Sequence, residues 1–237
     1  MRSKYLVGGG GGGSSTDLYD EVHYRMDDLL ESGGSVLKVN DLSPRGNDAI
    51  QSNGTYQPSY NSSDANYNNQ PTITFNNDFF VFLRGGVNVD YTFGTVIMFI
   101  GNIISGQKAE ILGANEGSNN RFALFADISR VRNQYKNFTR GTLTDDLTDS
   151  TLSDPAIWMS ISDNTTIYWY KNGILVDSEP LNVFSNGFTE FGACGSLIRS
   201  QMTVAEFRIY NKFDLTKINS FGSDAATDFG FSWTTIT

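Results

Sequence analysis

The chain has a single cysteine, Cys194, and a single histidine, His23, among its 237 residues. One cysteine excludes an internal disulfide, and two such residues cannot form a Cys/His cluster of the kind that binds zinc. Cys194 lies among small residues, so we interpret it as a small buried side chain rather than a nucleophile, which would need a nearby histidine. We interpret His23 as a surface residue of a strand.

Basic residues are also scarce. The chain contains 17 Lys and Arg against 26 Asp and Glu, and its net charge of −9 argues against binding to nucleic acid or to an anionic membrane surface. It has no run of about 18 apolar residues, so we expect no segment to insert into a membrane. The basic start at residues 1–8 is not followed by the apolar stretch of a secretory signal.

The residues that are abundant favour β structure. Hydrophobic residues make up 39% of the chain and aromatic residues 13%, which is enough for one large core, whereas charged residues make up only 18%. Asn, Ser, Thr and Gly are frequent, and these residues suit turns better than helices. The length fits one all-β domain, which we place at residues 18–237 after an N-terminal arm at residues 1–17.

The clearest pattern is a three-stranded meander at residues 157–178. Apolar and polar residues alternate in 157–162, as expected for a strand with one buried face. Asp163 begins a polar turn, aromatic and β-branched residues occupy 167–170, and Asn172-Gly173 forms a second tight turn. Such a meander needs a second layer to bury its apolar face, so the sequence predicts a two-sheet antiparallel β-sandwich.

Three segments carry a resemblance to a known family. Residues Trp158–Val176, Met202–Lys212 and Leu42–Ala49 resemble, in this order, the central signature, the late strand and the early loop of laminin-G-like domains. These domains belong to the concanavalin-A-like lectin and glucanase superfamily. The resemblance covers roughly residues 22–222 and implies a jelly-roll sandwich. It does not specify the function, because this fold occurs in lectins, glycosidases, adhesins and spacers.

The carboxylates do not match those of the superfamily's glucanases, which carry paired catalytic carboxylates on one strand. The sequence shows no such array, so we expect the protein not to be an enzyme. The resemblance does imply calcium, bound through Asp and Asn oxygens, and four aspartates near strand ends are candidate ligands: Asp78, Asp90, Asp127 and Asp163. In the loop at 41–48, Asp41, Asn47 and Asp48 either hold a cation or cap turns, and we favour turns.

Candidate ligand-binding residues lie on two predicted strands. Arg130 and Arg132 share one face of a strand at 130–135 that also contains Tyr135, and this face is either a polar ligand platform or an ordinary solvated surface. The second group comprises Tyr168 and Tyr170 on the central meander.

The termini suggest attachment. Tyr5, Leu6 and Val7 precede six glycines and two serines, so residues 1–17 are either a flexible tail or an anchor for a particle. Near the other end, we expect one helical turn at 214–220 and an aromatic strand containing Phe229, Phe231 and Trp233.

Together these features lead to one functional hypothesis and two alternatives. We expect a virion-surface attachment protein, a phage head-fibre or tail-fibre tip, that binds surface glycans, docks to other virion proteins through its arm and forms a homotrimer. One alternative is a carbohydrate-binding or adhesion module of a cellular surface protein. The other is a decoration protein without a ligand.

Overall fold

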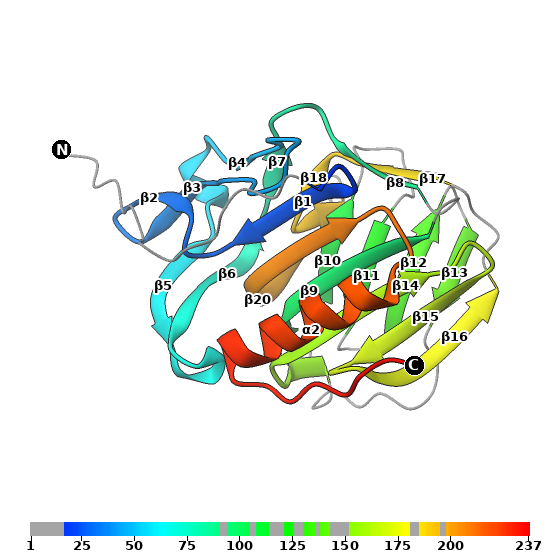
Figure 1. Ribbon diagram of the computed structural model, residues 1–237. Coiled ribbons are helices and arrows are strands. Elements are labelled where there is room, and N and C mark those ends of the chain that lie inside the picture. Colours follow the sequence, from blue (N-terminus) through cyan, green and yellow to red (C-terminus); the bar gives the residue numbers. More distant parts are fainter. Residues whose placement is uncertain are drawn as a thin grey trace.

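The computed structural model describes residues 17–90, 94–104, 108–113, 121–125, 130–135, 138–142, 152–180, 185–194 and 198–237. Within these residues the chain forms an all-β sandwich of two antiparallel layers, called the front and back sheets below, which one strand pairing joins at an edge (Figure 1). The predicted fold class is therefore confirmed. The predicted anchor, Tyr5, Leu6 and Val7, lies outside the described residues, and the division at residue 17 stays a prediction.

The front sheet is organised around β20, whose two edges pair with different strands. β1 and β6 pair along one edge of β20, and β9 pairs along the other. β14, β15 and β16 follow β9 in that order, and β5 flanks β6. The strands are β1 (Asp20–Arg25), β5 (Ser59–Asp64), β6 (Gln70–Asp78), β9 (Thr95–Ile103), β14 (Ala156–Ser162), β15 (Thr166–Lys171), β16 (Ile174–Pro180) and β20 (Ile198–Tyr210).

The back sheet runs in the order β2-β3-β4-β7-β18-β10-β11-β12-β13. Its strands are β2 (Leu29–Ser32), β3 (Ser35–Val39), β4 (Ala49–Ile50), β7 (Phe80–Phe82), β10 (Lys108–Gly113), β11 (Arg121–Phe125), β12 (Arg130–Tyr135), β13 (Phe138–Thr142) and β18 (Glu190–Phe191). β8 (Val87–Asp90) pairs with β17 (Ser185–Phe188), and β19 (Ala193–Cys194) pairs with the start of β20. Two short 3₁₀ helices, η1 (Gly54–Tyr56) and η2 (Ala65–Tyr67), lie beside β5 in the sequence.

The main core fills the space between the two sheets. Its centre is aromatic, and the rings of Phe191 and Phe207, one from each sheet, lie 4.9 Å apart. Phe75 packs edge-on against Phe191 with ring centroids 5.5 Å apart. Complete burial of such a side chain stabilises the fold by about 1.5–3 kcal/mol, so this aromatic centre holds the sheets face to face.

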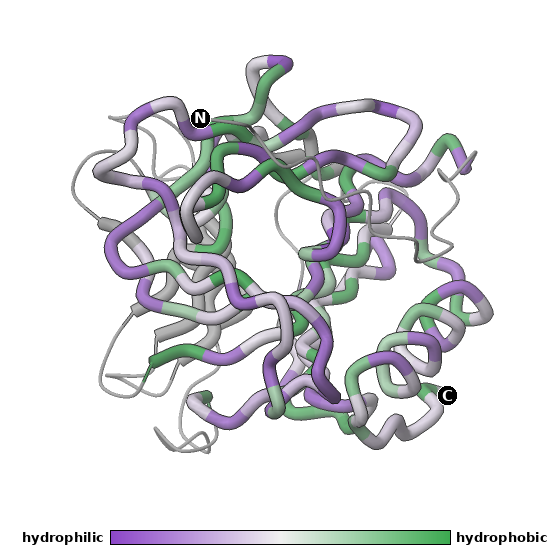
Figure 2. Tube along the Cα trace, turned by 90° about the vertical axis from the view of Figure 1, so that its left-hand side faces the viewer, coloured by the Kyte–Doolittle hydropathy of each residue, from purple (hydrophilic) through white to green (hydrophobic). Residues whose placement is uncertain are grey.

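A second core lies on the outer face of the front sheet, beneath the helix α2 (Leu215–Phe229). Ile97 and Phe99 of β9 point into the main core, whereas Val96, Met98 and Ile100 point toward α2. Figure 2 shows the helix as a separate layer, with hydrophobic and hydrophilic residues alternating along its turns. Because both faces of β9 are covered, its sequence is apolar without interruption.

The C-terminal prediction is wrong. Asp214 does cap a helix, and its Oδ1 accepts a hydrogen bond from the Lys217 N–H at 3.2 Å, but that helix continues for 15 residues. Phe229 is its last residue, and Gly230 ends it with φ of 76°. Phe231 and Trp233 follow in an irregular tail that packs against the second core. The outer face of the sheet is thus covered by a helix and a tail, not edged by an aromatic strand.

The alternation of side chains along β20 is interrupted at one position. Phe207 and Ile209 point into the main core, but Ala205 points to the opposite face. The register between β20 and β9 shifts between Val204 and Glu206, and this bulge changes the face of the residue within it.

Among the described residues, no helix combines the length and the apolar character that crossing a bilayer requires.

Candidate ligand-binding face

The turn between β14 and β15 is built by Asp163. Its Oδ1 accepts hydrogen bonds from the Thr165 N–H at 2.9 Å, the Thr165 hydroxyl at 2.7 Å and the Thr166 N–H at 2.8 Å. Asn164 adopts a left-handed conformation with φ of 71°, which asparagine tolerates better than most residues. The side chain of Asp163 therefore fixes the backbone that starts β15, as the polar turn in the sequence predicts.

Two tyrosines of β15 lie side by side on the outer face of the front sheet. Ile167 and Trp169 alternate with them and are buried in the main core, so Tyr168 and Tyr170 point to the opposite side. Their ring centroids are 6.5 Å apart with an interplanar angle of 36°. Both are half-buried, and Tyr170 packs against the edge of the second core. These two predicted ligand residues thus form one aromatic surface.

The hydroxyl of Tyr168 donates to Asp163 Oδ2 at 3.0 Å. Partial burial acts to raise the pKa of Asp163, but the hydrogen bonds from Thr165, Thr166 and Tyr168 outweigh it and hold this pKa below its ordinary value. Burial, and then repulsion from Tyr168, raise the pKa of Tyr170. At neutral pH the surface therefore carries one carboxylate and a protonated Tyr170.

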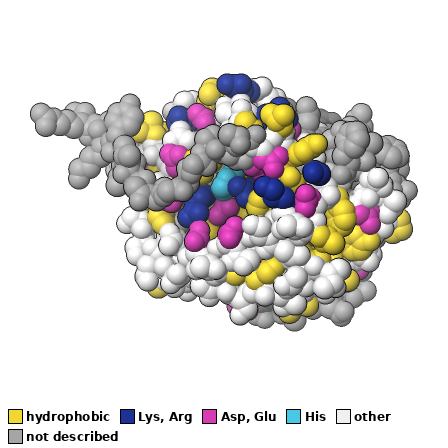
Figure 3. All heavy atoms as spheres, in the orientation of Figure 1, with side chains coloured by type: hydrophobic (Ala, Val, Ile, Leu, Met, Phe, Trp, Pro, Cys, Tyr) yellow, Lys and Arg dark blue, Asp and Glu magenta, His cyan; other side chains and the backbone are white. Residues whose placement is uncertain are grey.

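β16 extends this surface toward the edge of the sheet. Leu175 is the cross-strand partner of Tyr170, and Ser178 is the partner of Tyr168. The side chain of Leu175 is 52% exposed. We call the surface formed by Tyr168, Tyr170, Leu175 and Ser178 the tyrosine face. Hydrophobic side chains, tyrosine included, are visible over this end of the sheet in Figure 3.

The arginine group of the prediction lies elsewhere. Arg130, Arg132 and Tyr135 all belong to β12, which is a strand of the back sheet. β15 is in the front sheet, so the strand of these three residues is in the opposite layer from the tyrosine face (Figure 1). The five predicted ligand residues therefore do not form one site, and a role for the arginine group stays a prediction.

The three candidate calcium ligands that the structure describes, Asp78, Asp90 and Asp163, are also dispersed. Asp78 ends β6 and is buried, with its Oδ2 accepting from the Asn76 N–H at 2.8 Å. Asp90 ends β8, Asp163 lies in the β14–β15 turn, and Asp127 is outside the described residues. In the described part of the chain, no three His, Cys, Asp or Glu side chains gather closely enough to hold a metal ion. Calcium binding stays a prediction.

The predicted turn at 41–48 is confirmed. Asp41 accepts hydrogen bonds from the backbone N–H groups of His23, Ser43 and Asn47 at 2.7–2.9 Å. Asp48 accepts from the N–H of Asp41 at 2.9 Å. The carboxylates thus cap the loop, as expected for short acidic side chains in tight turns.

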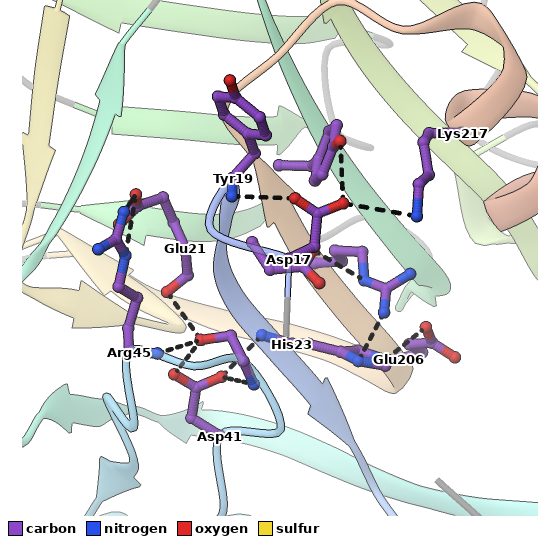
Figure 4. A network of polar contacts seen from close by, with 12 residues as sticks. Asp17, Tyr19, Glu21, His23, Asp41, Arg45, Glu206 and Lys217 are labelled. Carbon is purple, nitrogen blue, oxygen red and sulfur yellow. Dashed lines mark hydrogen bonds and ion pairs between the residues drawn. The ribbon is translucent and has the colours of Figure 1, made fainter. Parts of the chain in front are cut away.

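A charged cluster that the sequence does not single out ties β1 to β20. Nδ1 of His23 lies 2.7 Å from the Arg208 guanidinium, and Nε2 lies 3.0 Å from Glu206 Oε1 (Figure 4). Since Arg208 can only donate, Nδ1 accepts and the Nε2–H donates to Glu206. The side chain of His23 is only 13% exposed, so its interpretation as a surface residue is wrong.

The same cluster reaches the helix. The guanidinium of Arg208 lies 4.2 Å from the centre of the Phe221 ring on α2, and its Nε is 3.7 Å from Asp20 Oδ1. Charged side chains are visible over this region in Figure 3. His23 and Arg208 are cross-strand partners, yet they are 185 residues apart in the sequence. Only the register of β1 on β20 brings them together, and the sequence does not give that register.

A scan against protein-family models and a search of the curated proteins found no match. Among solved structures, Trypanosoma rangeli sialidase in complex with sialic acid matches with a TM-score of 0.50 and 14% identity, over 98% of this chain and 36% of that chain. A mutant of this sialidase with trans-sialidase activity matches with a TM-score of 0.50 and 11% identity, over 90% and 34% of the two chains.

Domain 4 of a GH43 extracellular arabinanase from Geobacillus stearothermophilus, in complex with arabinotriose, gives a TM-score of 0.47 and 13% identity, over 81% of this chain and 92% of that chain. At these identities, the likeness to the sialidases concerns the fold alone. The chain spans about a third of their length. The function therefore has to be inferred from the site.

Proposed function

We propose that this chain is a non-enzymatic carbohydrate-binding module that binds surface glycans through the tyrosine face. The observation that carries the proposal is the pair of adjacent, half-buried rings of Tyr168 and Tyr170 on an outer sheet face. The C–H groups on one side of a sugar ring pack well against an aromatic ring, while the sugar hydroxyls need hydrogen-bonding groups beside it. Tyrosine supplies both the aromatic ring and a hydrogen-bonding hydroxyl, at a low cost in conformational entropy.

The position of the pair supports the proposal. α2 and the C-terminal tail cover the middle of the outer face, and Tyr170 lies at the border of this covered region. The tyrosines are therefore held by packing on one side and open to solvent on the other. A shallow face of this size binds a glycan weakly, and several copies on one assembly raise the overall affinity.

The chemistry of the face favours binding over hydrolysis. Retaining glycosidases place two carboxyl groups about 5–5.5 Å apart, and inverting ones place them about 6.5–9.5 Å apart. Asp163 is the acidic group hydrogen-bonded to the tyrosine face, and its Oδ1 accepts three hydrogen bonds within its own turn. We therefore expect bound glycans to be recovered intact.

We further propose that the module is the tip of a virion appendage, a phage head fibre or tail fibre, and that it forms a trimer. Support comes from the sequence of the arm, in which Tyr5, Leu6 and Val7 precede a glycine-rich tether. Deletion of residues 1–13 should leave folding and glycan binding intact and abolish attachment to a particle. Sedimentation should give three times the mass of one chain; a monomer would contradict the trimer.

Glycan binding is tested on an array with and without a chelator. We expect at least one glycan to bind, and Tyr168→Ala and Tyr170→Ala each to weaken its binding by about tenfold, the loss of about 1.4 kcal/mol in stacking and burial. Tyr19→Ala, which removes an exposed tyrosine elsewhere, is the matched control. A chelator-sensitive signal would support calcium. Absence of binding to every glycan, or equal binding by all variants, would refute the proposed function.

A further inference from the structure

We infer that the tyrosine face selects neutral sugars over sialylated or sulfated ones, and that Asp163 is the residue that determines this selectivity. The inference rests on the proposed function, because it names the class of glycan that the same face takes. It follows from the direction of one hydrogen bond, from the charge beside the rings and from the position of the neighbouring lysine.

The hydrogen bond between Tyr168 and Asp163 decides what the face offers to a ligand. The hydroxyl of Tyr168 has one hydrogen to donate, and it donates this hydrogen bond to Asp163 Oδ2 at 3.0 Å. Its oxygen lone pairs then remain for other partners, so Tyr168 meets a ligand as an acceptor. The carboxylate of Asp163 is itself an acceptor only. This side of the tyrosine face therefore needs a ligand that donates hydrogen bonds.

Neutral sugars meet this requirement, whereas acidic groups do not. Every sugar hydroxyl donates one hydrogen bond, and neighbouring hydroxyls can reach the oxygens of Tyr168 and Asp163 together. A sialic acid carboxylate or a sulfate ester presents only acceptor oxygens. No hydrogen bond could therefore form between such a group and the oxygens of Tyr168 and Asp163. It would also bring a negative charge toward Asp163, and like charges brought together at a binding surface weaken binding.

The nearest lysine in the sequence does not offset this charge. Lys171 follows Tyr170, but its Nζ lies 5.4 Å from the ring centre of Trp158, which belongs to the main core. Among the described residues, no ion pair joins a lysine or arginine to Asp163. The net charge of −9 acts in the same direction at longer range. Electrostatic repulsion and the direction of the Tyr168 hydrogen bond therefore both act against sialylated and sulfated glycans.

The test compares matched glycans on one array, each neutral oligosaccharide beside its sialylated and its sulfated form. We expect the full chain to bind at least one neutral glycan and to bind its acidic forms about tenfold more weakly. Asp163→Asn keeps an oxygen that can accept the hydrogen bonds of the turn, and it removes the charge. Its N–H₂ group lies near Tyr168, so the Tyr168 hydroxyl can donate its hydrogen bond to a ligand instead. This variant should reduce the neutral-to-acidic ratio at least fivefold.

Asp224→Asn is the control, because it changes the net charge equally at an exposed position on α2. It should leave the ratio unchanged. Three outcomes separate the two proposals. If no glycan binds, the proposed function fails and the inference fails with it. If acidic glycans bind as tightly as neutral ones in a manner that needs Tyr168 or Tyr170, the function stands and the inference is wrong. If Asp163→Asn binds with an unchanged ratio, Asp163 does not determine the selectivity.

Discussion

Trp233 packs its indole ring directly on Gly222 of α2, and a Cβ atom on that glycine would overlap the ring. In an exposed helix, replacing glycine by alanine stabilises by about 1 kcal/mol. Here overpacking costs about 1–3 kcal/mol, so we predict that Gly222→Ala lowers the free energy of unfolding in urea. Ser223→Ala, at the exposed neighbouring position, is the control and should not destabilise. A Gly222→Ala protein at least as stable as wild type would show that Trp233 packs elsewhere.

Asn219 fastens the C-terminal tail to the helix. Its Nδ2 donates to the Ile236 carbonyl at 2.9 Å, and its Oδ1 accepts from the Ile236 N–H at 2.8 Å and the Trp233 indole at 3.3 Å. We predict that Asn219→Ala costs about 1–3 kcal/mol, because it leaves partly buried polar groups without partners. Hydrogen exchange of residues 231–237 should accelerate. Ser220→Ala is the control, and equal exchange in both variants would contradict the prediction.

Glu206 gives the fold a defined response to acid. Burial acts to raise the pKa of Glu206, but the hydrogen bond from His23 and the positive charges of Arg208 and Arg25 hold it below the ordinary value of 4.5. A group with a lowered pKa contributes stability above its unfolded pKa, and this contribution is lost as the pH falls through its folded pKa. Stability should therefore decrease below about pH 4.5.

The variant Glu206→Gln tests this pH dependence. At pH 7 we expect it to be about 3 kcal/mol less stable than wild type, because it leaves buried positive charge without its partner. The difference should shrink as the pH falls below 4.5, when wild type also loses the carboxylate. Glu21→Gln removes a pair with the 46%-exposed Arg45 and should cost less than about 1 kcal/mol. A pH-independent difference for Glu206→Gln would contradict the role assigned to this carboxylate.

Much of the sandwich can be predicted from the sequence, because its strands carry strong local signals. The continuous apolar run at Val96–Ile100 indicates a buried strand, and Asn172-Gly173 indicates a tight turn that the structure forms with positive φ at both residues. Alternation across Tyr168, Trp169 and Tyr170 predicts which side chains share a face. These signals depend only on neighbouring residues, so they can be recognised without the fold.

The sequence predicts only the first turn of α2, because half of the positions on its buried face are glycine or alanine. Its inner positions do recur at helical spacing: Ile218, Phe221, Gly222, Ala225, Ala226 and Phe229. Gly222 and the alanines give little hydrophobic signal, and glycine disfavours helices in isolation. The close approach of Trp233 explains the glycine, but this contact is visible only in three dimensions. The pairing of His23 with Arg208 was missed for a similar reason, since it depends on strand register.

The turn at Asp163 gives a last prediction, which separates folding from binding at the tyrosine face. Asp163→Ala removes the acceptor of three hydrogen bonds within the turn and of a fourth from Tyr168, and we expect a loss of about 1 kcal/mol. Asn at this position retains an amide oxygen for the two backbone N–H groups, so Asp163→Asn should unfold close to wild type at neutral pH.

Because the pKa of Asp163 lies below its ordinary value, the advantage of wild type over Asp163→Ala should hold above about pH 4 and disappear as the carboxyl is protonated. Urea unfolding at a series of pH values measures both variants against wild type. Equal stability of Asp163→Ala and wild type at pH 7 would mean that the turn does not need this carboxylate. If Asp163→Asn is as stable as wild type, any change in its glycan preference comes from the ligand face and not from a disturbed fold.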